Sequence, residues 1–238
     1  MLFAIEIDYL CAMQQTALNL IAIGVFSITF LSLLSPILNI SPLIPAGITL
    51  GIMGFATVDT LGLGNRGITL ILDSFSSPEE RKRILHHEAG HFLVAYFLSI
   101  PVTGYTLTAW EAFRQGQPGR GGVVFDRDGL SEKITAMQAP LILERFSTVL
   151  MGGIAAENLV YGKSEGGEED RLQLRSVLMS VGQNPQVHKQ KERWALLQAT
   201  NIIKQNRESY EALVKAMEAK ASVDDCYKAI QQKCESFS

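Results

Sequence analysis

The residues with the clearest chemical meaning are two histidines that enclose a glutamate. His87, Glu88 and His91 stand in the order H-E-A-G-H, which matches the motif HExxH. In a helix, residues four apart project from the same face, so the two imidazoles can converge on one ion. Two neutral imidazoles and a carboxylate suit zinc and leave a fourth position for a water that Glu88 can reach. The motif therefore predicts a hydrolytic zinc site with Glu88 as general base.

The residues before the motif predict the helix that this pairing requires. Ser77 is followed by Pro78 and, three residues on, by Glu80, which is typical of an N-cap, a first-turn proline and a capping box. The helix should run to about Ser99, because Pro101 disfavours helical backbone just before it.

Two other residues of this segment, His86 and Gly90, are not predicted metal ligands. His86 points away from the His87 face, so contact with solvent or support of a ligand fits it better than ligation. Gly90 in a helix interior costs about 1 kcal/mol relative to alanine. Close approach of a substrate or of a second helix would explain that cost.

A third metal ligand must come from elsewhere in the chain, and spacing alone leaves several candidates. The long metzincin motif is excluded, because Val94 and Phe97 replace its glycine and histidine. One further histidine, His188, lies in a polar helix start. The acidic candidates are Glu157, Glu165, Glu168, Glu169 and Asp170. For the glutamates among the last four, the alternative is a solvated loop or helix start, where the helix dipole favours acids.

The remaining elements are predicted from apolar periodicity and breakers. Strands are expected at residues 102–110 and 121–125, and helices at 140–161, at 170–181 and from 185 nearly to the end with a break near 222. Gly162 is expected to end the helix predicted over 140–161. The predicted fold class is therefore mainly α with a small β element.

The N-terminal residues 1–64 are predicted to form a membrane-anchoring hairpin. Residues 17–35 are nineteen uncharged residues, roughly 28 Å of helix, and the uncharged residues 43–58 follow. The first basic residues, Arg66 and residues 81–83, come after both stretches. The positive-inside rule then predicts an integral membrane protein with its peptidase domain on the cytoplasmic or stromal-equivalent side. A buried soluble hairpin is the alternative, whereas a signal peptide lacks its basic start.

Composition excludes several function classes. Hydrophobic residues make up 47% and charged residues 19% of the chain, which excludes intrinsic disorder. Residues 65–238 carry as many acids as bases, so no nucleic-acid partner is expected. Three scattered cysteines exclude a disulfide framework and favour a reducing compartment.

Three segments resemble the peptidase domain of the FtsH family, the membrane-anchored ATP-dependent zinc metalloproteases. They are HEAGH at 87–91, MGGIAAENLVYG at 151–162 and IIKQNRESYEALVKAMEAKASVD at 202–224. Together they cover roughly residues 77–230. Residues 65–76, rich in small and polar residues, are a predicted connector, and the resemblance implies a helical zinc metallopeptidase domain of FtsH type with C-terminal helices at 77–238.

The resemblance also implies roles for single residues. The family takes its third zinc ligand from an aspartate that opens the next helix, and Asp170 is the matching position, although EGGEED replaces the usual TGASND. Glu157 would then orient a zinc-binding histidine. The family adds extended substrate to a strand whose counterpart is residues 121–125. The implied substrate-binding residues are Gly121, Gly122, Val123 and Val124.

The chain departs from the family in having no room for an ATPase module. Residues 162–164 read GKS, but Glu157 stands where a phosphate-binding loop needs glycine, so no ATP site is expected. Unfolded substrates, an FtsH-type ATPase partner or a homo-oligomer would have to serve instead.

The leading hypothesis is a membrane-anchored zinc endopeptidase acting on polypeptides. The alternative is a non-catalytic FtsH-like subunit that serves as scaffold or adaptor of an ATP-dependent protease complex. An intramembrane protease is excluded, because residues 81–83 are basic and the motif lies outside any spanning helix.

Overall fold

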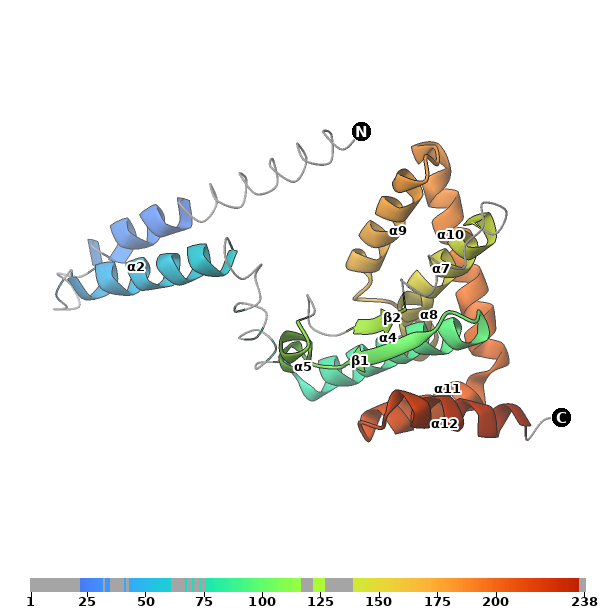
Figure 1. Ribbon diagram of the computed structural model, residues 1–238. Coiled ribbons are helices and arrows are strands. Elements are labelled where there is room, and N and C mark those ends of the chain that lie inside the picture. Colours follow the sequence, from blue (N-terminus) through green and yellow to red (C-terminus); the bar gives the residue numbers. More distant parts are fainter. Residues whose placement is uncertain are drawn as a thin grey trace. The chain divides into compact units, whose positions relative to one another are not determined.

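The computed structural model of the protein (Figure 1) divides into two compact units, residues 1–68 and 69–238. It describes residues 22–31, 33–34, 43–60, 76–116, 122–126 and 139–235, together with the single residues 41, 67, 70 and 73.

The N-terminal unit contains a helix over residues 22–31 and helix α2, Leu43–Val58. Helix α2 has 16 residues, about 24 Å, whereas a bilayer core measures about 30 Å. No helix in the described part of the chain is both long and apolar enough to cross a membrane. The predicted integral membrane localisation is therefore wrong. The predicted hairpin over residues 1–64 falls partly outside the described residues, which leave out residues 17–21, 32 and 35 of its first stretch.

The second unit is built around α4, Pro78–Phe97, which begins as the sequence predicts. The Ser77 side chain accepts a hydrogen bond from the backbone N–H of Glu80 at 3.1 Å and so confirms the N-cap. The C-terminal half of α4 is almost fully buried, with Phe92 and Leu93 entirely inaccessible. Because the HExxH residues lie at the start of this buried half, their positions are fixed by core packing.

Several other helices of this unit pack on α4 directly or on a helix that does so (Figure 1). They are α7 Ala139–Leu150, α8 Gly152–Tyr161, α9 Glu168–Ser180, α10 Pro185–Gln205, α11 Arg207–Glu218 and α12 Val223–Glu235. The single helix predicted over 140–161 is wrong, because a turn at Met151 separates α7 from α8. The turn gives α8 its own direction along α4. Gly162, with φ 78°, ends α8 as predicted.

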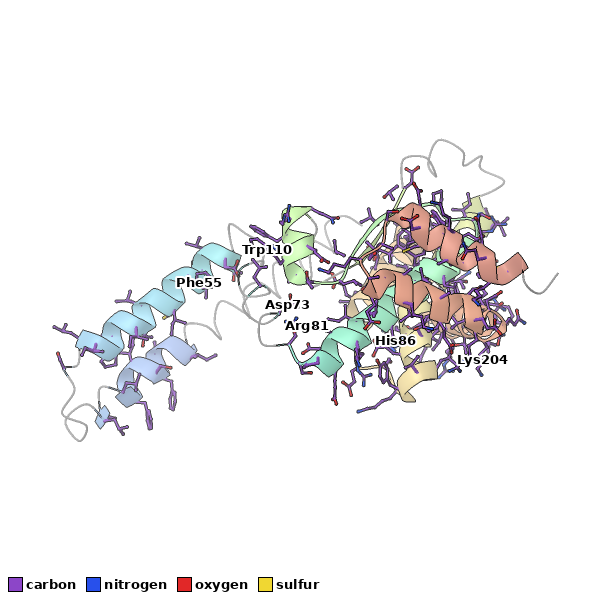
Figure 2. All side chains as sticks on the ribbon, turned by 90° about the horizontal axis from the view of Figure 1, so that it is seen from below. Phe55, Asp73, Arg81, His86, Trp110 and Lys204 are labelled. Atoms are coloured by element: carbon purple, nitrogen blue, oxygen red, sulfur yellow. The ribbon has the colours of Figure 1, made fainter. Side chains whose placement is uncertain are left out.

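The β element is a two-stranded antiparallel sheet of β1, Val102–Thr106, and β2, Gly122–Phe125. The prediction that the first strand reaches residue 110 is wrong, because α5, Ala109–Arg114, begins there. The Thr108 side chain accepts from the backbone N–H of Glu111, and Asp73, labelled with Trp110 in Figure 2, accepts from that of Ala109. The predicted fold class, mainly α with a small β element, is confirmed for the second unit.

Candidate metal centre

Three side chains from two helices converge at the HExxH motif. Nε2 of His87 lies 3.0 Å from Oδ2 of Asp170, and Nε2 of His91 lies 3.3 Å from Oδ1. The two Nε2 atoms are 3.1 Å apart. Asp170 belongs to the first turn of α9, 83 residues from His87 along the chain. The structure thus brings the two motif histidines together with the predicted third ligand, and the three form a group that could hold a metal ion.

The opposite ring nitrogen of each histidine is already engaged. Nδ1 of His91 donates to the Val149 carbonyl oxygen at 2.7 Å, and Nδ1 of His87 donates to Oε1 of Glu157 at 2.7 Å. Since a carbonyl or carboxylate only accepts, the proton of each neutral ring must sit on Nδ1. Both Nε2 lone pairs then face each other and the Asp170 carboxylate, an arrangement that only a cation or added protons can stabilise. The donor set fits a zinc ion, which favours imidazole and carboxylate ligands.

The pKa shifts of His87, His91 and Asp170 also indicate that positive charge is favoured between these side chains. Burial lowers the pKa of His87, but hydrogen bonds to Asp170 and Glu157 outweigh it and raise the value to about 10. Burial lowers the pKa of His91, but the charge of Asp170 outweighs this effect and raises the value. Burial raises the pKa of Asp170, yet the two histidines hold it well below its ordinary value. The site therefore stabilises cationic charge between these three side chains.

Glu88 lies beside the converging ligands rather than among them. Its side chain is buried, and its Oε2 has no hydrogen-bond partner among the described residues. Burial raises its pKa, against the lowering effects of His87, His91 and a hydrogen bond from the backbone N–H of Val123 in β2. A buried carboxylate oxygen without a partner is rare in proteins and marks a group that can accept a proton from a bound reactant.

Glycines bring α8 against the motif helix. A Cβ atom on Gly90 would overlap the carbonyl oxygen of Gly152, and a Cβ on Gly152 would lie 2.7 Å from the carbonyl oxygen of Gly90. A Cβ on Gly153 would overlap the imidazole of His87. Of the two explanations that the sequence left open for Gly90, the structure shows the second, close approach of another helix.

Replacing Gly90 by alanine should destabilise the protein, although alanine is the better helix former. The added Cβ meets backbone atoms that cannot move aside, and overpacking of this kind costs about 1–3 kcal/mol. Thermal unfolding followed by circular dichroism measures the loss. Gly54→Ala in α2, where a Cβ meets nothing within 4 Å, is the matched control and should leave stability equal or higher. Equal stability of Gly90→Ala and the wild type would contradict the close packing of α4 and α8.

Other predicted residues lie beside the site or outside it. Nδ1 of His86 is 2.9 Å from the Tyr210 hydroxyl of α11, so His86 is not part of the converging group. His188 was expected at an exposed helix start, but it is buried, and its Nε2 lies 3.2 Å from the carbonyl oxygen of Gln183. Glu165 is an exposed loop residue, and Glu168 and Glu169 lie in the exposed first turn of α9.

The predicted substrate-binding residues lie in or next to β2. Gly122, Val123 and Val124 pair with β1, whereas Gly121 lies outside the described residues. Within the described part of the chain, β1 is the one strand partner of β2. The hydrogen bond from Val123 to Glu88 places this strand next to the metal-ligand group.

Sequence reasoning missed Arg83. Its Nη1 donates to Oε2 of Glu157 at 3.1 Å, so it contacts the carboxylate that holds His87. Its position four residues before His87, on the same helix face, was a signal that could have identified it.

Comparison with known proteins gives a partial likeness. No family model matches the chain. A stretch of 114 residues, 47% of the chain, is 33% identical to the ATP-dependent zinc metalloprotease FtsH 1 of Sorangium cellulosum (strain So ce56). That stretch covers 16% of the relative, so the chain spans a small part of its length. Part of this chain is thus similar to an FtsH protein, and its fold brings together a His–His–Asp group suited to a metal ion.

Proposed function

We propose that the chain is a zinc metalloendopeptidase in which His87, His91 and Asp170 hold the metal. The observation that supports this most strongly is the convergence of Nε2 of His87, Nε2 of His91 and the Asp170 carboxylate. Hydrogen bonds from the Nδ1 atoms of the two histidines to Val149 and Glu157 fix the tautomer of each ring. The partial likeness to a zinc metalloprotease supports the same metal and the same reaction class.

Glu88 and Glu157, next to the proposed ligands, would have different functions in the reaction. When bound, zinc supplies Lewis-acid chemistry, which acidifies a coordinated water and polarises a carbonyl. Glu88 takes the proton of the attacking water on its carboxylate and later delivers a proton to the leaving amine. Its buried surroundings raise its pKa, and this brings the carboxylate closer to the basicity that proton transfer near neutral pH requires. Glu157 keeps the His87 ring in the tautomer that ligates through Nε2.

Polypeptides are the substrate class that this site favours. A strand added along the edge of β2 that faces away from β1 would form backbone hydrogen bonds with alternate residues among Gly122, Val123 and Val124. Because the N–H of Val123 bonds to Glu88, such a strand would lie close to the general base. Backbone pairing requires an extended substrate, so unfolded chains fit this edge better than folded ones.

An extended substrate must be brought to this site in some way. The relative is named an ATP-dependent protease, whereas this chain offers no phosphate-binding motif: its GKS residues 162–164 follow helix α8 rather than a strand. We infer that the site acts on chains that are already unfolded or that a partner ATPase or a homo-oligomer presents to it.

Metal removal tests the proposed function. The purified protein should cleave an unstructured polypeptide, a zinc chelator should abolish the cleavage, and one equivalent of zinc should restore it. Cleavage is followed by gel electrophoresis, with Mg²⁺ added back as the control ion that imidazole ligands do not favour. Zinc-loaded, folded protein that cleaves nothing, yet assembles with an ATPase ring, would overturn catalysis in favour of the scaffold alternative.

A further inference from the structure

Arg83 occupies a distinctive place on α4, one helical turn before the first metal ligand. Residues 83, 87 and 91 follow each other at intervals of four, so they share one face of the helix. The side chain of Arg83 is only 20% exposed, unlike those of Arg81 and Lys82 beside it, which stand in exposed positions. A largely buried guanidinium must be matched by acceptors, so its contacts show what it is there to hold.

The first contact is with the carboxylate that orients His87. Nη1 of Arg83 lies 3.1 Å from Oε2 of Glu157, while Oε1 of Glu157 accepts from His87. The Glu157 side chain is 2% exposed. Oε2 of Glu157 also accepts from the backbone N–H of Glu165 at 2.9 Å. Arg83 therefore sets a permanent positive charge against this buried carboxylate and fixes its orientation toward His87.

The second set of contacts is with the loop that leads to Asp170. Nη1 of Arg83 also donates to the Lys163 carbonyl oxygen at 3.2 Å, and its Nε lies 3.5 Å from Oε2 of Glu165. The guanidinium carbon stands 4.3 Å from the centre of the Tyr161 ring at the end of α8. One side chain of the motif helix thus touches the end of α8 and the loop before α9.

We propose that Arg83 is a positioning residue of the metal centre. It fixes the orientation in which Glu157 accepts from His87, and it holds the loop that presents Asp170 to the two histidines. It touches none of the three ligands, so it acts on the metal through Glu157 and through the loop. The inference rests on the proposed metal centre.

The shape of the guanidinium explains why arginine serves here. A planar group with several N–H donors can bond to a carboxylate and a carbonyl while it stacks on a ring. A lysine ammonium can reach Glu157 but lacks the planar face and the fork. Arg83→Lys should therefore keep part of the effect, whereas Arg83→Met, similar in length but uncharged, should lose it.

Zinc retention tests the proposal. Zinc should bind Arg83→Met about 10- to 100-fold more weakly than the wild type, the usual cost of losing a group that orients a metal ligand. Competition with a chromophoric chelator measures the affinity. The absorption bands of the Co²⁺-loaded protein should shift or weaken as well, because they report ligand geometry, which a loss of global stability alone leaves unchanged. Arg83→Lys should lie between the two proteins.

Arg81→Met is the matched control. Arg81, labelled in Figure 2, lies two residues away on the exposed side of α4. Its replacement removes the same charge from the same helix and should leave zinc affinity and the Co²⁺ bands unchanged. An equal effect of Arg81→Met and Arg83→Met would show that net charge alone matters and would overturn the proposal.

A double-mutant cycle with Glu157→Gln tests the route of the effect. If Arg83 acts largely through Glu157, the double variant should bind zinc more tightly than the product of the two single effects predicts. If the two single effects multiply, the route through Glu157 is overturned. Wild-type zinc affinity in folded Arg83→Met would overturn the inference while leaving the metal centre in place. A wild-type protein that binds no zinc would instead overturn the proposed function itself.

Discussion

Glu88→Gln should abolish peptide cleavage while the protein keeps its zinc. The substitution preserves the size of the side chain but removes the carboxylate that accepts the proton of the attacking water. General bases contribute about 10²- to 10⁴-fold to a reaction rate, so turnover of an unstructured polypeptide should fall by at least about 100-fold. Because Glu88 lies beside the ligand group and not in it, zinc content should remain at one ion per chain. Initial rates at saturating substrate, with metal analysis of the same samples, measure both quantities.

The control for this prediction is Glu169→Gln. Glu169 is an exposed residue beside Asp170 in the first turn of α9, and the same exchange there should leave turnover unchanged. Turnover by Glu88→Gln within a few-fold of the wild type would refute the assigned mechanism. A loss of both zinc and turnover would mean that Glu88 holds the metal, which also contradicts the role proposed for it.

Local features of the site could be predicted from the sequence. The Ser77 cap and the spacing of His87 and His91 depend on residues within a few turns of one another, and the structure has both as expected. The short helix α5 could also have been predicted, because Thr108 and Glu111 form the start of a capping box. It was missed because the aromatic and β-branched residues around it favour a strand.

Features that depend on distant contacts could not be derived from local pattern. Asp170 was one of several acids until the family resemblance singled it out, because its partners lie 83 and 79 residues away. The packing of Gly90 on Gly152 likewise depends on how α8 crosses α4. Apolar periodicity continues through residue 151, so it gives no signal of the turn that separates α7 from α8 at Met151.

The N-terminal unit shows where composition misleads. Residues 17–35 are uncharged over a length that predicts a membrane span, yet no helix among the described residues is both long and apolar enough to cross a membrane. The second uncharged stretch, residues 43–58, forms α2, which is shorter than a bilayer core. Apolar composition favours burial of a helix away from water, whereas crossing a membrane also requires a helix that is long enough to span the bilayer core.

Asp170→Ala should lose zinc under conditions in which the wild type retains it. Removing one of three protein ligands leaves two imidazoles, which do not complete a zinc site. The remaining lone pairs of His87 and His91 also lose the carboxylate charge that balances a divalent ion. Glu169→Ala, one residue earlier on the exposed side of the same turn, should bind zinc as the wild type does.

The most direct measurement is therefore the zinc content of the wild-type chain and of Asp170→Ala after dialysis against metal-free buffer, determined by elemental mass spectrometry. We expect about one zinc ion per wild-type chain, as a site of three protein ligands requires, and almost none in Asp170→Ala. Equal zinc in the two proteins, or none in the folded wild type, would contradict a metal centre formed by His87, His91 and Asp170.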